Sequence, residues 1–166
     1  MVGIPSRDLH LFGHALANQK IMVLFHELDD VRVHLITGNP DRAAGHDSTQ
    51  GDDRYLGRHG VPVSLDQPIG VVLDLGGADT YEGGPRPVSL GCGLFGLGGI
   101  FDLSGDDHYR CAEAGLGAGI FGTGLVVDCA GNDAYALDTH HGQGSGLAGV
   151  GLLIDLAGDD AYTCGY

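Results

Sequence analysis

The sequence predicts a mostly β protein built as a parallel β-helix, or solenoid, in which a repeat of about 27 residues forms each coil. Three observations predict this fold class. A short motif recurs at near-constant spacing, glycine and apolar residues alternate before each copy, and glycine occurs 31 times among 166 residues. The strict Gly-X-Y period of collagen is absent, so the glycines indicate an ordered repeat that needs them at fixed backbone positions.

The motif reads Asp, two residues, Gly, one residue, Asp, one residue, Tyr. Its four copies are Asp74–Asp79–Tyr81, Asp102–Asp107–Tyr109, Asp128–Asp133–Tyr135 and Asp155–Asp160–Tyr162. The leading aspartates lie 28, 26 and 27 residues apart, and a degenerate copy over 48–55 precedes them. One copy cannot bury its apolar residues alone, so we expect the copies to stack, with Tyr109 and Tyr135 in neighbouring coils.

Glycine and apolar residues alternate with period 2 before each motif, which is typical of strands, and the 3.6 periodicity of a helical repeat is absent. A β-propeller is the weaker alternative, because 27 residues are few for a four-stranded blade. Leu94, Ile120 and Leu147 are predicted to line one inner column, and Val127 and Ile154 another. The glycines then form a side-chain-free outer face for interactions, or they point inward where the coil is narrow; the outer face is favoured.

The N-terminal third lacks the repeat. Residues 1–45 are predicted to form a capping unit of α+β type, with a helix over 6–19 and strands over 21–28 and 31–37. Residues 46–166 are predicted to form about five coils, the first degenerate and the last truncated, because the chain stops four residues after Tyr162. Either the chain is a fragment or another chain covers this open end.

The amino-acid composition limits the classes of partner that the protein is expected to bind. Eight Lys and Arg against 22 Asp and Glu give a formal charge of −14, which disfavours nucleic acid and favours divalent cations or basic partners. The four cysteines show no zinc-site spacing. The longest uncharged apolar run, 114–127, is too short for a membrane span. No signal peptide is visible, so the compartment stays open, with the extracellular space or the cell surface favoured.

Stacking places the motif aspartates in two columns. Asp74, Asp102, Asp128 and Asp155 form one column, and Asp79, Asp107, Asp133 and Asp160 form the other. Like charges about 4.8 Å apart repel each other, so something must offset the repulsion. One alternative is hydrogen bonding of the carboxylates to backbone N–H groups in the turns, and the other is Ca²⁺ bound by both columns. The tyrosine column is predicted to be a stacked aromatic ladder, with a carbohydrate platform as the alternative.

Short stretches such as Gly-Asn-Asp-Ala-Tyr over 131–135 resemble half-turns of the RTX calcium β-rolls. That resemblance implies calcium, but it covers only five to eight residues per copy, and RTX motifs recur every nine residues. The longer pattern resembles tandem repeats with Gly-[Asp/Asn]-Asp-x-Tyr in uncharacterised bacterial proteins, which imply no function.

We therefore expect a non-enzymatic structural or adhesive scaffold, self-associating through the glycine-rich face or the open C-terminal coil. Of the two ways to stabilise its aspartate columns, hydrogen bonding is favoured and Ca²⁺ is the alternative. The alternative is a carbohydrate-binding or polysaccharide-acting β-helix protein. An active site should break the repeat with a unique acid or base, whereas these carboxylates recur in register. No catalytic residue and no organic cofactor is predicted: the nine histidines match no H-E-x-x-H pattern, and the Gly-x-Gly-x-x-Gly of 91–96 is not followed by a helix.

Overall fold

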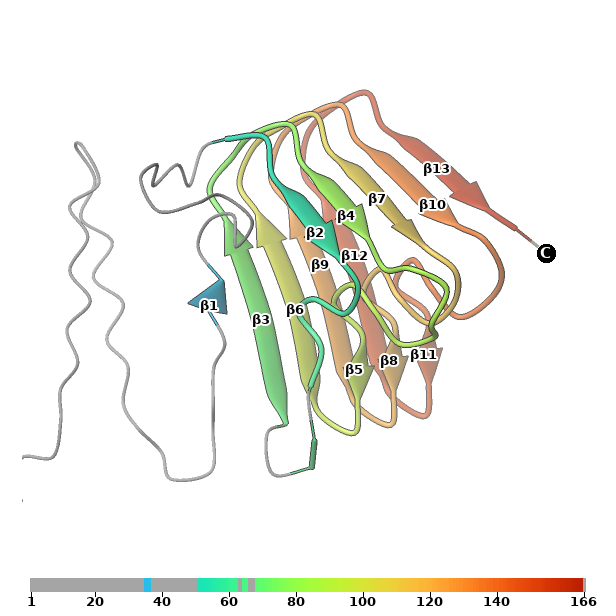
Figure 1. Ribbon diagram of the computed structural model, residues 1–166. Helices are drawn as coiled ribbons and strands as arrows, with labels where there is room; N and C mark the ends of the chain where they lie inside the picture. The colour runs from blue at the N-terminus through green and yellow to red at the C-terminus, as the bar shows by residue number, and fades with distance from the viewer. Residues whose placement is uncertain (1–34, 37–50, 63, 66–67, 166) are drawn as a thin grey trace, which may run out of the picture.

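The computed structural model describes residues 35–36, 51–62, 64–65 and 68–165, which form a parallel β-solenoid (Figure 1). The first sheet contains β1 (Leu35–Ile36), β3 (Ile69–Asp74), β6 (Leu97–Asp102), β9 (Thr123–Asp128) and β12 (Val150–Asp155). The second contains β2 (Arg54–Leu56), β4 (Thr80–Glu82), β7 (His108–Cys111), β10 (Ala134–Leu137) and β13 (Ala161–Cys164). The third contains β5 (Gly93–Leu94), β8 (Gly119–Ile120) and β11 (Gly146–Leu147). These described strands all pair in parallel, unlike the blades of a propeller.

Equivalent motif residues are direct partners in the sheets, as the spacing predicted. Asp102 pairs with Asp74 on one side and Asp128 on the other, and Tyr109 pairs in the same way with Tyr81 and Tyr135. The degenerate copy joins this register, because Tyr55 pairs with Tyr81. Stacking of the coils is thereby confirmed, and it holds for the described part of all five copies of the motif.

The tyrosines form a continuous ladder inside the solenoid. Neighbouring rings from Tyr55 to Tyr162 stack with centroids 4.6 to 4.9 Å apart and planes within 4° to 9° of parallel. The first four rings are at most 1% exposed, and only Tyr162, in the last coil, is half exposed. The stacked-ladder interpretation is confirmed, and the rings of the first four tyrosines are buried and not available to a sugar.

The face assignment of the apolar columns was wrong. The fully buried column consists of Val72, Ile100 and Val126, two residues before each leading aspartate. Alternate strand residues share a face, so an inward aspartate requires the residue two positions earlier to point inward as well. Val127, immediately before Asp128, is therefore only half buried, and Ile154 is exposed.

The predicted column in the third sheet lies at the margin of the core. Leu94 and Ile120 are half buried, and Leu147 is 46% exposed. The interior positions of this region are instead occupied by the glycine columns. A Cβ at Gly98 or Gly124 would lie 2.3 or 2.0 Å from a backbone oxygen of Cys92 or Ala118. Of the two orientations considered, the glycines adopt the inward one, where two backbones pass too close for any side chain.

The predicted helix over 6–19 and the strand over 21–28 lie outside the described residues. Within the predicted strand over 31–37, Leu35 and Ile36 form β1, which pairs with β3 and so extends the first sheet. In the described ranges, no helix is long and apolar enough to cross a membrane.

Candidate metal centre

A tight glycine turn brings the two aspartate columns together. Each leading aspartate ends a strand of the first sheet, and each second aspartate follows the turn and precedes a strand of the second sheet. Gly105 in this turn has φ +156°, and a Cβ there would lie 1.6 Å from the carbonyl oxygen of Gly77. Gly131 repeats this arrangement against Gly105, with a Cβ position 1.5 Å from that carbonyl oxygen. Glycine is required because turns of successive coils touch through their backbones.

The leading aspartates are held by tyrosines, a link that the sequence reasoning missed. The hydroxyl of Tyr81 donates to Oδ2 of Asp102 at 2.6 Å, and the hydroxyl of Tyr109 donates to Oδ2 of Asp128 at 2.7 Å. Tyr55 donates to Asp74 in the same way. The other oxygen, Oδ1, accepts from the backbone N–H two residues later, at 2.9 to 3.3 Å. Burial first and neighbouring carboxylates second raise the pKa of Tyr81, so this hydroxyl remains a donor.

The second aspartates are held by the backbone of the neighbouring coil. Oδ1 of Asp107 accepts from the N–H of Asp79 at 2.6 Å, and Oδ1 of Asp133 accepts from the N–H of Asp107 at 2.7 Å. The same bond joins Asp160 to the N–H of Asp133 at 3.0 Å. Hydrogen bonding to turn N–H groups, one of the two alternatives drawn from the sequence, is therefore present.

These hydrogen bonds account for only one oxygen of each second aspartate. Within the described part of the chain, Oδ2 of Asp79, Asp107 and Asp133 is buried and has no hydrogen-bond partner. The three residues are only 0%, 0% and 2% exposed. A buried polar atom without a partner costs about 1–3 kcal/mol, and more if it is charged. Something beyond hydrogen bonding has to compensate for these oxygens.

In the part of the chain that the structure describes, the two columns converge into four groups of three carboxylates, which we call the triads. The triads are Asp53–Asp74–Asp79, Asp79–Asp102–Asp107, Asp107–Asp128–Asp133 and Asp133–Asp155–Asp160. In each, one oxygen per residue lies within 4.8 Å of the other two. Ca²⁺ binds oxygens at about 2.3–2.6 Å, so ligands on opposite sides of one ion are about 4.6–5.2 Å apart. The triads thus bring the eight sequence-predicted aspartates together at a spacing that fits this ion, and they add Asp53.

The ion pairs between described residues do not involve the triad carboxylates. Among the described residues, the arginine–carboxylate ion pairs are Arg54–Glu82 and Arg110–Asp138, and both lie at the surface. The first three triads consist entirely of buried residues, whereas Asp155 and Asp160 of the fourth are half buried. The interior of the solenoid therefore carries a column of carboxylates with no positive charge from these arginines beside it.

Burial changes the acidity of the triads. Desolvation, with a smaller contribution from the neighbouring carboxylates, raises the pKa of Asp107 to about 9, although the backbone N–H of Asp79 acts in the opposite direction. Desolvation is also the largest cause for Asp79 and Asp133, whose pKa is raised to about 7, and for Asp102, whose pKa is raised to about 6. Without a cation, these carboxyl groups retain protons near neutral pH, because the charged form is poorly solvated. The triads accordingly need either protons or a cation.

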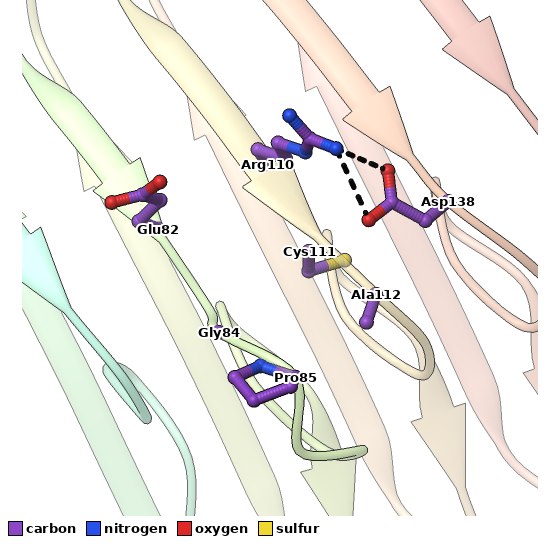
Figure 2. Close-up of a pocket in the computed structure, with 7 residues that line it drawn as sticks. All are labelled: Glu82, Gly84, Pro85, Arg110, Cys111, Ala112 and Asp138. Atoms are coloured by element: carbon purple, nitrogen blue, oxygen red, sulfur yellow. Dashed lines mark hydrogen bonds and ion pairs between the residues drawn. The ribbon is translucent and has the colours of Figure 1, made fainter.

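A surface hollow of about 310 Å³ lies away from the triads and is lined by Glu82, Gly84, Pro85, Arg110, Cys111, Ala112 and Asp138. Figure 2 shows the guanidinium of Arg110 reaching the carboxylate of Asp138, 3.1 Å away. Glu82 on the other side pairs with Arg54 at 2.7 Å. Burial raises the pKa of the Cys111 thiol to about 12, which leaves it a poor nucleophile. The charges of this hollow are already paired, so the triads are the stronger candidate site.

Comparison with known proteins gives no relative: no protein-family model, no curated protein and no solved structure matches the chain. The site is therefore interpreted from its own chemistry.

Proposed function

We propose that the protein is a non-enzymatic structural scaffold whose coils are held together by Ca²⁺ bound to the triads. The observation that carries the proposal is the buried, unpartnered Oδ2 of Asp79, Asp107 and Asp133 in the described chain. A cation at a triad supplies the partner that these oxygens lack and offsets the repulsion between carboxylates.

The ligand type favours calcium. The triads offer only carboxylate oxygens, which suit hard cations, whereas structural Zn²⁺ sites use Cys and His. Mg²⁺ demands near-ideal octahedral geometry and keeps several water molecules, which a buried triad does not easily accommodate. Ca²⁺ tolerates irregular sets of oxygens and bidentate carboxylates, so it fits three buried aspartates better.

Thermal unfolding of the full chain tests the proposal. Protein freed of metal by chelation at pH 7.5 should melt at a lower temperature than protein with Ca²⁺. An ion that binds only the folded state stabilises it by about 2.7 kcal/mol at 100 times its Kd. Asp107→Asn should reduce the response to Ca²⁺. Asp106→Asn, a change of the exposed neighbouring carboxylate, should leave the response intact. Equal melting temperatures with chelator and with Ca²⁺ would refute the proposal and favour protonated aspartates as turn caps.

We further propose self-association through the last described coil. Strands β11, β12 and β13 are edge strands of their sheets, and Leu152 and Leu156 nearby are 44% and 63% exposed. Unpaired strand edges pair readily with another chain. Light scattering across a dilution series tests this, since Leu152→Lys should shift the protein to a monomer while an unchanged mass would oppose it. We also propose an extracellular or cell-surface location, where even calcium sites with a Kd of about 10⁻⁴–10⁻³ M are used.

Carbohydrate binding is the second candidate, and a different aromatic column supports it. Phe95 and Phe121 are 55% and 57% exposed and stack on each other with centroids 5.3 Å apart. Both adopt a positive φ, of 52° and 50°, which is unusual for large side chains and is often retained at functional positions. Retention of the wild type, but not of Phe95→Ala or Phe121→Ala, on immobilised polysaccharide would support this candidate; equal retention of all three would oppose it.

A further inference from the structure

Neighbouring triads share ligands. Asp79 belongs to the first and second triads, Asp107 to the second and third, and Asp133 to the third and fourth. Each leading aspartate, by contrast, belongs to one triad only. Nine carboxylates therefore form four sites that are linked end to end along the solenoid axis.

Each shared aspartate also has a buried oxygen without a hydrogen bond to the described residues. Each of the three uses Oδ1 to accept the N–H of the preceding coil, while its Oδ2 is buried without a hydrogen bond among the described residues. The preceding coil therefore fixes each carboxylate through Oδ1, and Oδ2 remains able to bind a cation. An ion that binds one triad holds the shared carboxylate in position for the ion in the next triad.

We infer that the triads form one connected row, in which a Ca²⁺ ion occupies each coil junction and the ions bind cooperatively. This inference rests on the proposed function and specifies how its site fills. Four divalent ions carry eight positive charges against nine carboxylates, so a full row nearly neutralises the buried charge.

Repulsion between the ions does not prevent filling of the row. Adjacent junctions are one strand spacing apart, about 4.8 Å, whereas each ion has three carboxylates at a ligand distance of about 2.4 Å. Coulomb energy falls with distance, so attraction to the three near carboxylates exceeds repulsion from one or two ions twice as far away. The partly filled row is the unfavourable state, because it leaves buried carboxylates without a counter-ion.

If neighbouring triads share ligands, single substitutions should differ in the number of ions that they remove. Asp107→Asn changes two triads, whereas Asp128→Asn changes only the third triad, which both residues share, and is its matched control. Both residues are buried and both aspartates become isosteric amides. Asp128 also accepts from the hydroxyl of Tyr109, so ion counts are compared only for variants that fold. Asp106→Asn, at the exposed position next to Asp107, changes none.

Native mass spectrometry and calorimetric titration of the metal-free full chain with CaCl₂ test the inference. The wild type should bind four ions with a Hill coefficient above 1. Asp107→Asn should lose two ions, Asp128→Asn one and Asp106→Asn none. Circular dichroism in Ca²⁺ checks folding of each variant, and Asp79→Asn, also in two triads, replaces Asp107→Asn if that chain does not fold. The wild-type count and Hill coefficient test the inference even if neither variant folds.

Two results overturn it in distinguishable ways. If the wild type binds Ca²⁺ at fewer than four junctions or at independent sites, or if Asp107→Asn and Asp128→Asn lose equal numbers of ions, the row is refuted while the calcium scaffold survives. If the wild type binds no Ca²⁺ and its melting temperature does not change when Ca²⁺ is added, both the row and the proposed function are refuted.

Discussion

The metal-free protein should lose stability as the pH rises from 5 to 8.5, opposite to the usual behaviour of a protein with ionised carboxylates. The folded-state pKa is about 7 for Asp79 and Asp133 and about 9 for Asp107, against an ordinary value of 3.8. A raised folded-state pKa gives stability that is fully present below about pH 4 and is lost as the pH passes through 7 to 9.

The expected loss of unfolding free energy is large relative to the total stability of a domain. For Asp79 alone, the rise from 3.8 to about 7 corresponds to roughly 4 kcal/mol, at 1.36 kcal/mol per pKa unit. Small proteins have a total stability of about 5–15 kcal/mol, so the charging of several triads consumes most of it. Ca²⁺ should remove this loss, because ionised carboxylates bind the ion.

Urea unfolding at pH 5, 7 and 8.5, in metal-free buffer and in buffer with Ca²⁺, measures the effect. Without metal, the unfolding free energy should be highest at pH 5; with Ca²⁺, the decline towards pH 8.5 should disappear. Asp107→Asn should flatten the metal-free profile, since an amide does not ionise, while Asp106→Asn should not. An unfolding free energy that rises from pH 5 to 8.5 in metal-free wild type would show that the triads are stable as anions and would refute the reasoning.

Three further predictions concern the solenoid itself. Ile100→Ala should destabilise the protein by about 2–5 kcal/mol in urea unfolding, and Leu125→Ala on the opposite strand face by clearly less; equal losses would contradict the corrected face assignment. Tyr109→Phe keeps the ring stack but removes the bond to Asp128, and should cost about 1–3 kcal/mol; no loss would mean that water replaces the hydroxyl. Gly131→Ala should prevent folding, because its Cβ would lie 1.5 Å from the Gly105 oxygen, whereas Gly99→Ala, with its nearest contact at 3.3 Å, should fold by circular dichroism.

The spacing of the motif was enough to predict the register. Residues such as Asp102 and Asp128 recur one coil apart, and parallel in-register pairing is the arrangement that stacks every equivalent position. The direction of the side chains was not predictable in the same way. An alternation of period 2 defines two faces but does not say which one is inside. Charged residues are usually exposed, so the aspartate face was the less expected one to be buried.

The tyrosine hydroxyls contain the signal that would have settled the choice. In each copy of the motif, a tyrosine follows the leading aspartate by seven residues. Tyr81 and Tyr109 donate to the leading aspartate of the next coil, whereas Tyr162 donates to Asp155 of its own coil. The backbone conformation at the turns between strands was harder to predict. Leu90 and Leu116 occupy equivalent places with φ of 38° and 48°, and nothing in a leucine side chain favours that conformation. Stacking on the same corner of the neighbouring coil holds them there, which is a tertiary effect.

The regularity of the interior favours a mechanical role for the aspartates over a chemical one. A catalytic pair of carboxyl groups has to be open to a substrate. Here Asp79 and Asp133 sit in equivalent surroundings with the same direction and cause of pKa shift, and both are closed off by the coils above and below. The first three junctions repeat the same bonds: a tyrosine of one coil to the leading aspartate of the next, a backbone N–H to the second aspartate, and a buried oxygen without a partner among the described residues. A structure that leaves the same buried oxygen unsatisfied in successive coils repeats a binding position, and a cation that fills it links each coil to the next.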